Sequence, residues 1–304
     1  MSQRRVSPAI AALAVACLAV GAGCTRSRQP VASVSAPQTQ LELPHGSMLS
    51  LELTWQPSQP LPSGTTPLVF MHLLDAQGNI TRTFDHPFPG RWQVGSAVRD
   101  RVALYHSAIG PALSPGDYRL TVGLYDGKKE RFDLEGAGGE VGKREYVIAQ
   151  VKAPAVAPTA PTLTFSPEWS APEPTGDRQS LARRWLSGDG TLEVAGVAAP
   201  ARLWILLNIP KSDPGLRQVL DAGLPETTLP AVRVSANCGG GFSADVAGEG
   251  LHEVAVPIQA AGPCTVAFDT NFTVVEIATG RKLSVDLEQI GWETGNAAMP
   301  PTGP

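Results

Sequence analysis

The sequence predicts an all-β protein with two antiparallel β-sandwich domains, the first immunoglobulin-like and the second jelly-roll-like. Three observations lead to this prediction. Glycine and proline are abundant, at 31 and 28 of the 304 residues, and they separate short segments. Within those segments apolar and polar residues alternate with the period of a β-strand. A stretch of alanine, proline and threonine at 153–162 divides the strand-rich sequence into two parts.

The chain begins with a segment typical of a secretory signal peptide. Residues 1–23 combine two arginines with an apolar stretch, 9–20, that is too short to span a bilayer. Residues 24–40 are polar and rich in serine, proline and glutamine. This composition predicts a flexible tether between the signal peptide and the first domain.

The first domain is expected at residues 41–152. In the segment MLSLELTW, at 48–55, leucine or tryptophan occupies every second position, which predicts a half-buried strand. LVFMHLL, at 68–74, is a continuous apolar run that predicts a strand buried on both faces. Further strands are expected at 80–84, 97–105, 118–125 and 145–151. Short strands at this spacing are typical of an immunoglobulin-like sandwich.

The segment SPGDY, at 114–118, predicts a tyrosine corner. In this feature a tyrosine near the start of a strand donates a hydrogen bond to the backbone a few residues upstream. The expected role of Tyr118 is therefore structural.

Residues 153–162 are expected to form a semi-stiff linker, residues 163–293 a second sandwich, and residues 294–304 a disordered tail. Strands of the second sandwich are expected at 191–195, 202–209, 231–236, 252–256, 264–268, 272–277 and 283–290. One helix is also expected at 213–223, because Asp213 suits a helix N-cap and Gly223 a helix end.

The four cysteines have different expected fates. Cys17 lies in the signal peptide and Cys24 directly after it. Cys238 and Cys264 remain in a chain that is expected to be exported, where a disulfide is the natural pairing. A metal site is the alternative, but two thiolates without histidines at ligand spacing are too few for one.

The ending of the signal segment, Gly21-Ala22-Gly23-Cys24, resembles the lipobox of bacterial lipoproteins. The resemblance implies that Cys24 carries a diacylglyceryl thioether and an N-acyl chain such as palmitate. It also implies a lipid-anchored protein of the cell envelope, at the outer membrane in a Gram-negative cell. Ordinary secretion with cleavage near Ala22 is the alternative, because Gly21 stands where the lipobox has a larger aliphatic residue.

About a third of the chain resembles a β-sandwich module of bacterial envelope proteins that is often appended to membrane glycosyltransferases. The resemblance implies a β-sandwich in the envelope. No segment resembles the membrane-spanning catalytic part of those enzymes, so transferase activity is not implied. The matching positions are Phe70, His72, Leu73, Asp85, Pro87, Trp92, Asp100, Gly116, Tyr118, Gly123, Tyr125, Asp126 and Arg131.

Composition and polar clusters narrow the possible chemistry. The formal net charge of −4 argues against a nucleic-acid partner, which needs a basic face. His72, Asp75, Asp85 and His86 form the best polar cluster for a metal, but His72 lies in an apolar strand and is expected to be a hydrogen-bonded core histidine. Asp100 lies between Arg99 and Arg101 on an expected strand, and it is expected to point inward and to pair with a conformationally fixed arginine. Neither a metal nor another cofactor is therefore expected.

Trp92 is the best candidate for contact with a ligand, together with Arg91 and His86 as hydrogen-bond donors. An exposed aromatic ring on a sandwich loop can stack on the apolar face of a sugar. The alternative is that Trp92 packs over the end of the sandwich as a plug.

These observations predict a membrane-anchored envelope lipoprotein with a non-catalytic binding or scaffolding role, contacting a glycan or an envelope protein. The chain has no Gly-x-Ser-x-Gly nucleophile elbow, and no catalytic residue is assigned. Two alternatives stay open. One is an enzyme that acts on envelope polysaccharide through Asp85, Asp100 and His86, and the other is a purely structural spacer or assembly factor.

Overall fold

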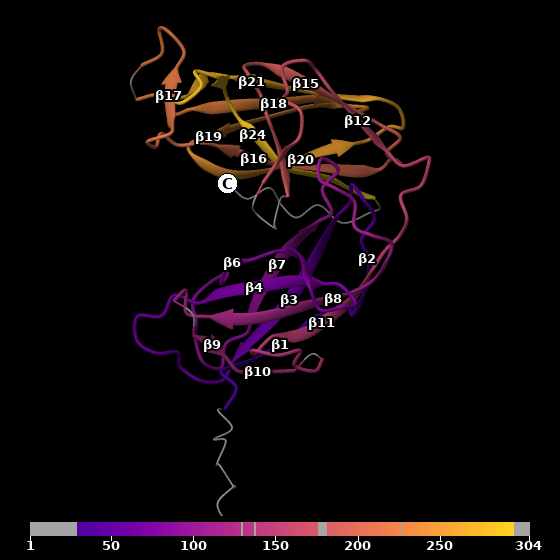
Figure 1. The fold of residues 1–304 in the computed structure, drawn as a ribbon, viewed down its shortest axis with the longest axis vertical. Helices are drawn as coiled ribbons and strands as arrows, with labels where there is room; N and C mark the ends of the chain where they lie inside the picture. The colour runs from indigo at the N-terminus through magenta and orange to yellow at the C-terminus, as the bar shows by residue number, and fades with distance from the viewer. Residues whose placement is uncertain (1–28, 129, 137, 176–180, 226, 295–304) are drawn as a thin grey trace, which may run out of the picture.

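The protein is an all-β molecule with two antiparallel β-sandwiches, one above the other along its long axis (Figure 1). The computed structural model describes residues 29–128, 130–136, 138–175, 181–225 and 227–294. Within these ranges no helix occurs, and therefore none that crosses a membrane. The predicted fold class is confirmed. The segment predicted to be a signal peptide, Cys24 and the residues beyond Thr294 lie outside the described residues.

The first sandwich has one sheet in the order β10-β1-β3-β7 and another in the order β2-β11-β8-β4-β5, with β6 beside β4 and β9 beside β8. Neighbouring strands are antiparallel except β1 with β10 and β2 with β11. The strands are β1 (Ala32–Ser35), β2 (Gln40–Glu42), β3 (Met48–Pro57), β4 (Leu68–Leu74), β5 (Ile80–Thr83), β6 (His86–Pro87), β7 (Val98–Tyr105), β8 (Gly116–Tyr125), β9 (Arg131–Phe132), β10 (Leu134–Glu135) and β11 (Tyr146–Ala153).

The core of the first sandwich lies between these sheets and follows the alternation in the sequence. On β3, Leu51, Leu53 and Trp55 are buried in it. β4 is buried along almost its whole length, as its apolar run predicts. On the outer side of β4, the ring of Phe70 lies against Gly123 of β8. A Cβ atom at Gly123 would come within 1.9 Å of that ring, so only glycine fits there.

The tyrosine corner is confirmed at the start of β8. The Tyr118 hydroxyl donates a hydrogen bond of 2.7 Å to the carbonyl oxygen of Ser114. The bond holds the segment that enters β8 against the end of the sandwich.

The prediction of a flexible tether is wrong for β1 and for the start of β2. Ala32 and Val34 of β1 are buried in the core, and β1 pairs with β3. Gln40 of β2 pairs with β11. β1 alternates apolar and polar residues over only four positions and β2 has only three residues, so neither is long enough to predict a strand. They form because the neighbouring strands supply hydrogen-bond partners and an apolar surface.

The second sandwich has two five-stranded sheets, in the orders β12-β15-β21-β18-β19 and β13-β14-β24-β16-β20, and a small third sheet, β17-β22-β23. Its apolar core is separate from that of the first sandwich along most of its extent. The strands are β12 (Thr162–Phe165), β13 (Glu173–Pro174), β14 (Ala182–Trp185), β15 (Gly190–Ala195), β16 (Ala201–Ile209), β17 (Leu216–Leu220), β18 (Ala231–Asn237), β19 (Gly241–Ala247), β20 (Gly250–Ile258), β21 (Cys264–Thr270), β22 (Phe272–Glu276), β23 (Lys282–Leu283) and β24 (Asp286–Thr294).

The helix expected at 213–223 is wrong, because this segment contains strand β17. The Asp213 carboxylate does accept hydrogen bonds from the backbone N–H groups of Gly215 and Leu216, at 2.6 and 2.9 Å. An aspartate makes such bonds in a turn as well as at a helix N-cap. β22 then pairs with β17 along its length, and this pairing favours the strand.

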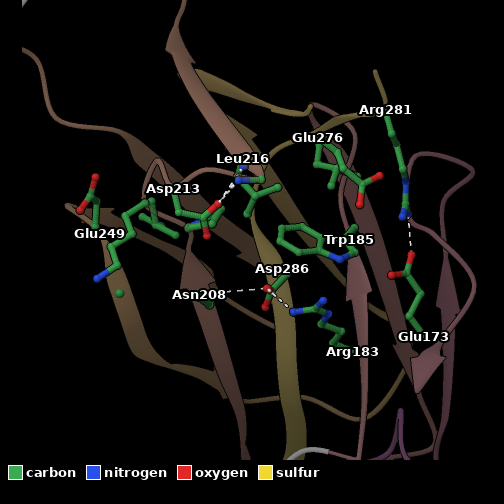
Figure 2. A pocket seen from close by; sticks show the side chains of 16 residues that line it. Glu173, Arg183, Trp185, Asn208, Asp213, Leu216, Glu249, Glu276, Arg281 and Asp286 are labelled. Carbon is green, nitrogen blue, oxygen red and sulfur yellow. Dashed lines mark hydrogen bonds and ion pairs between the residues drawn. The ribbon is translucent and has the colours of Figure 1, made fainter. Parts of the chain in front are cut away.

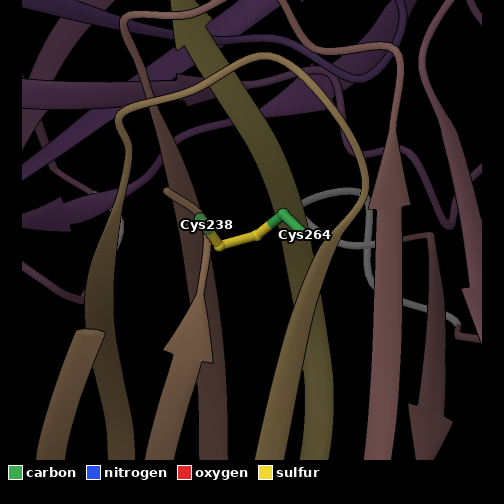
Figure 3. The surroundings of a disulfide bond; sticks show 2 residues. All are labelled: Cys238 and Cys264. Atoms are coloured by element: carbon green, nitrogen blue, oxygen red, sulfur yellow. A yellow bond between two sulfur atoms is a disulfide. The ribbon is translucent and has the colours of Figure 1, made fainter. Parts of the chain in front are cut away.

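The predicted disulfide between Cys238 and Cys264 is present (Figure 3). It joins the end of β18 to the start of β21, its neighbour in the sheet. Gly239 follows with φ +86°, and a Cβ atom there would lie 2.5 Å from that of Ala260. Glycine therefore permits the tight turn beside the bond.

The two sandwiches meet through backbone hydrogen bonds. The N–H of Trp292 donates to the carbonyl of Gly46 at 2.8 Å, and the N–H of Ala108 donates to the carbonyl of Ile290 at 2.9 Å. The Ser107 hydroxyl accepts a bond of 3.1 Å from the N–H of Ile290. β24 of the second sandwich is thereby tied to the loops at the end of the first.

Candidate functional site

A cavity lies in the second sandwich, between the sheet β13-β14-β24-β16-β20 and the small sheet β17-β22-β23 (Figure 2). Its volume is about 680 Å³, within the range of small-molecule sites. Arg183 and Trp185 reach it from β14, Asn208 from β16 and Asp286 from β24. We call these four side chains the pocket floor.

Asp286 is the most deeply buried group of the pocket floor, with none of its side chain exposed. Its Oδ2 accepts a hydrogen bond of 3.3 Å from the amide nitrogen of Asn208 and lies 3.8 Å from Nη1 of Arg183. No N–H or hydroxyl group of the described residues donates to its Oδ1. Burial, followed by repulsion from Glu288, raises the pKa of Asp286 to about 8. Burial therefore favours the uncharged form of this carboxyl group.

Arg183 also lines the cavity, and 38% of its side chain is exposed. Its guanidinium group is 4.9 Å from the centre of the Trp185 ring, which orients it by a cation–π contact. Its Nε is buried and has no hydrogen-bond partner in the described part of the chain. The guanidinium group of Arg183 is thus held in place, although at least one of its N–H groups makes no hydrogen bond within the described residues.

The strand pattern explains how the pocket floor is assembled. Arg183 and Trp185 are two residues apart on β14, so both face the cavity. The pairing of β24 with β16 shifts register between Leu287 and Gln289, which makes Glu288 the extra residue of a β-bulge. Bulges re-aim side chains. Here the bulge directly follows the segment that presents Asp286.

The rim of the cavity carries charged groups that already have partners. Nη2 of Arg281 lies 2.6 Å from Oε1 of Glu173. The Asp213 carboxylate is engaged by its own turn. These contacts hold Arg281, Glu173 and Asp213 in place at the rim.

The structure does not bring Trp92 into this pocket. Its ring lies 5.2 Å from that of Phe88 and packs against the core of the first sandwich. Its indole N–H donates a hydrogen bond of 2.9 Å to the carbonyl of Gln59. The half-buried ring matches the description of a plug, and the neighbouring Arg91 is exposed. A role for Trp92 or Arg91 in ligand contact stays a prediction.

His86 uses both ring nitrogens within the first sandwich. Nε2 lies 3.0 Å from Oδ2 of Asp100, and Nδ1 lies 2.8 Å from the carbonyl of Phe84. Burial by itself lowers the pKa of His86, but the bond and attraction of Asp100 outweigh it, so the pKa is raised. An imidazolium with two acceptors is a structural ion pair.

The expectation that Asp100 pairs with an arginine is wrong. The carboxylate is buried and accepts hydrogen bonds from Trp55, at 3.0 Å, and from His86. Asp100 points into the sandwich, while the arginines on either side of it in the alternating strand point out.

His72 is a hydrogen-bonded core histidine, as predicted. Its Nδ1 lies 3.0 Å from Oε1 of Glu145, and its Nε2 lies 3.8 Å from Oδ1 of Asp85. Asp85 also accepts a hydrogen bond from the N–H of Met71. Among the described residues, no group of three or more histidine, cysteine or acidic side chains is arranged to hold a metal ion.

The alternative of an enzyme that acts through Asp85, Asp100 and His86 requires these side chains to line a cavity that admits a substrate. Neither the pocket of the second sandwich nor a hollow of about 500 Å³ beside Tyr118 is lined by these residues.

The sequence did contain a signal for the pocket floor that the sequence reasoning missed. Asp286 lies between the apolar residues Val285 and Leu287 in a strand-like segment, and an aspartate in a buried strand is rare without a special role. The other members of the floor lie far away in the sequence, so their proximity depends on the strand order.

Comparisons with known proteins assign the chain to no family. No family model and no curated protein matches it. Solved structures that match the chain include the secreted serine protease VesC of Vibrio cholerae, at 8% identity and a TM-score of 0.27, covering 86% of this chain and 51% of that one. Tripeptidyl peptidase 2 is 10% identical with a TM-score of 0.24, covering 88% and 21%. The E. coli alpha-2-macroglobulin is 13% identical with a TM-score of 0.24, covering 88% and 14%.

The chain thus spans about half or less of these solved structures. At such TM-scores they carry no inference about function. What the fold and the site define is a two-domain β-sandwich protein with a polar pocket in its second domain.

Proposed function

We propose that this protein is a lipid-anchored lipoprotein of the bacterial envelope with a non-catalytic binding role, and that its second sandwich holds the ligand. The segment that ends at Cys24 supports the anchor. The pocket floor of Arg183, Trp185, Asn208 and Asp286 supports the binding role, and it is the observation that carries the proposal.

The arrangement of the two sandwiches suits such a role. The described chain starts at the far end of the first sandwich, and the second sandwich lies at the opposite end of the molecule (Figure 1). An anchor that precedes residue 29 therefore leaves the pocket on the side away from the membrane. The first sandwich acts as a spacer, and the second is free to meet a glycan or an envelope protein.

The pocket supports binding rather than catalysis. Its carboxyl group with the raised pKa, that of Asp286, lines the pocket but has no exposed side-chain surface. A general acid has to come within hydrogen-bond distance of the reacting atom. We assign Asp286 to the positioning of Arg183 and Asn208.

Metabolic labelling with palmitate tests the anchor. In a Gram-negative host, the wild-type chain should take up label and sediment with membranes, while Cys24→Ala should lose both properties. Cys17→Ala is the matched control, because it removes another cysteine of the same segment and should keep the label. Equal labelling of the wild type and Cys24→Ala would show that the anchor is not at this position.

A further inference from the structure

The charges around the pocket nearly balance, which bears on the class of ligand. Apart from the fully buried Asp286, three cationic residues face four acidic ones, an excess of one acidic group. The cationic lining residues are Arg183, Lys211 and Arg281, and the acidic ones are Glu173, Asp213, Glu249, Glu276 and Asp286. Because Arg281 and Glu173 form an ion pair, a strongly charged ligand finds no matching excess of opposite charge.

The pocket floor offers donors and acceptors side by side. Arg183 presents N–H groups, of which the buried Nε has no partner in the described structure. Asn208 presents an amide, and its nitrogen already donates to Asp286. A hydroxyl group donates and accepts at once, whereas an ammonium group only donates and a carboxylate only accepts. Hydroxyl groups therefore match this floor better than either charged group.

The cavity also has apolar walls and room for a ring. Leu216 and Ile209 line it beside Trp185. Its volume of about 680 Å³ equals that of roughly 20 water molecules at ~30 Å³ each, enough for a ligand of one or two sugar rings. Apolar side chains beside fixed polar groups suit a molecule that has C–H faces as well as hydroxyl edges.

We infer that the pocket binds an uncharged, hydroxyl-rich ligand, a neutral saccharide unit, which Arg183 and Asn208 hold by hydrogen bonds. The inference rests on the proposed role of the second sandwich as the binding domain and names its ligand class. Asp286 lies behind both contact residues and acts as a positioning residue. The guanidinium group of Arg183 is already oriented by Trp185, so binding loses little side-chain freedom there.

Saturation-transfer NMR on the full-length protein, in a detergent without a sugar headgroup, tests the inference. The probes are glucose, galactose and mannose and their β-linked disaccharides, with the corresponding amino sugars and uronic acids as charged counterparts. At least one neutral probe should bind, and its amino and uronic forms should bind more weakly. Tighter binding of a charged counterpart, or no binding of any neutral probe, overturns the inference.

Variants locate the contact. Arg183→Ala should weaken the binding by about tenfold or more, and Asn208→Ala by about five- to tenfold, as expected for the loss of hydrogen bonds to a ligand. Arg183→Lys keeps the charge but loses the planar fork, so it should weaken binding even if the alanine variant fails to fold. Arg99→Ala is the control, because Arg99 is exposed on the first sandwich and should leave binding unchanged.

The outcomes separate this inference from the proposed function. If Trp92→Ala abolishes binding while Asn208→Ala leaves it intact, the saccharide site is not this pocket. If Cys24 is labelled with palmitate but no neutral probe binds, the anchor is supported and the ligand class is wrong.

Discussion

Acid should destabilise the first sandwich through His106, and replacement of this residue by glutamine should remove the effect. His106 is 1% exposed. Its Nδ1 lies 3.0 Å from the carbonyl oxygen of Leu43, and its Nε2 accepts a hydrogen bond of 2.8 Å from the N–H of Leu113. A proton on Nε2 would face that N–H and lose the bond. Burial, the largest cause, and the nearby positive groups of His45 and Arg82 lower the pKa of His106 to about 4.

The size of the effect follows from the two pKa values. In the unfolded chain a histidine titrates near 6.5, and in the folded protein His106 titrates near 4. Because the folded pKa is the lower one, the unfolded state binds the proton first as the pH falls. Stability is thus fully present above pH 6.5 and is lost progressively below it. At pH 4 the loss amounts to about 3 kcal/mol.

Urea unfolding of the wild type and His106→Gln, from pH 7.5 to 4, measures this loss. Other groups titrate in both proteins, so the difference between their unfolding free energies isolates His106. The wild type should lose about 3 kcal/mol relative to the variant over this range. Ser107→Ala is the control, because it removes a hydrogen bond but no titrating group. A constant difference between the wild type and His106→Gln would refute the reasoning.

Two further predictions concern the domain contact and the pocket. Gly46→Ala should destabilise the protein by about 2 kcal/mol or more, because the new Cβ would lie 2.2 Å from the Trp292 ring at a φ of +77°. Calorimetry should show a smaller loss for Gly95→Ala, which has a φ of +83° but open space, and equal losses would contradict the steric argument. Because the pKa of Asp286 is raised, the folded wild type keeps a proton on this carboxyl group that the unfolded chain releases as the pH rises from 4 to 8. The wild type should therefore lose stability over this range, by up to about 1.4 kcal/mol per pH unit. Asp286→Asn has no such proton and should become more stable relative to the wild type. Denaturant titrations at several pH values measure this gain, and a pH-independent difference would show that Asp286 titrates normally.

The strands and their grouping into two sandwiches were predictable because the period of the side chains is a local property. The same holds for the hydrogen bond of Tyr118, since its acceptor lies four residues upstream. The disulfide was predictable for a different reason, because only Cys238 and Cys264 remained to pair.

The errors share one cause, which is that the deciding partner is distant in the sequence. The bonds of Asp213 to its own turn suit a helix as well as a turn, and only β22 decides for the strand β17. β1 carries little apolar pattern of its own and is fixed by β3. Asp100 sits between arginines in the chain but bonds to His86 and Trp55 in space. The neighbouring residues in the sequence do not predict any of these three pairings.

The pocket floor also depends on residues that are distant in the sequence. Arg183 and Asp286 are about a hundred positions apart and become neighbours because β14 and β24 are adjacent in one sheet. The sequence offered the unusual aspartate but not its neighbours. Which strands lie together is a property of the topology, and the candidate site follows from it.

The contact between Gly46 and Trp292 bears on the role of residues 154–161, which link β11 of the first sandwich to β12 of the second. Because backbone bonds fix how the two sandwiches meet, the linker need not set their orientation. Its remaining contribution is to keep the two halves at a high effective concentration, so that a parted junction closes again within the same molecule. Lengthening the linker then slows re-closure without changing the angle between the domains, whereas a cut leaves two halves that reassociate in proportion to their concentration.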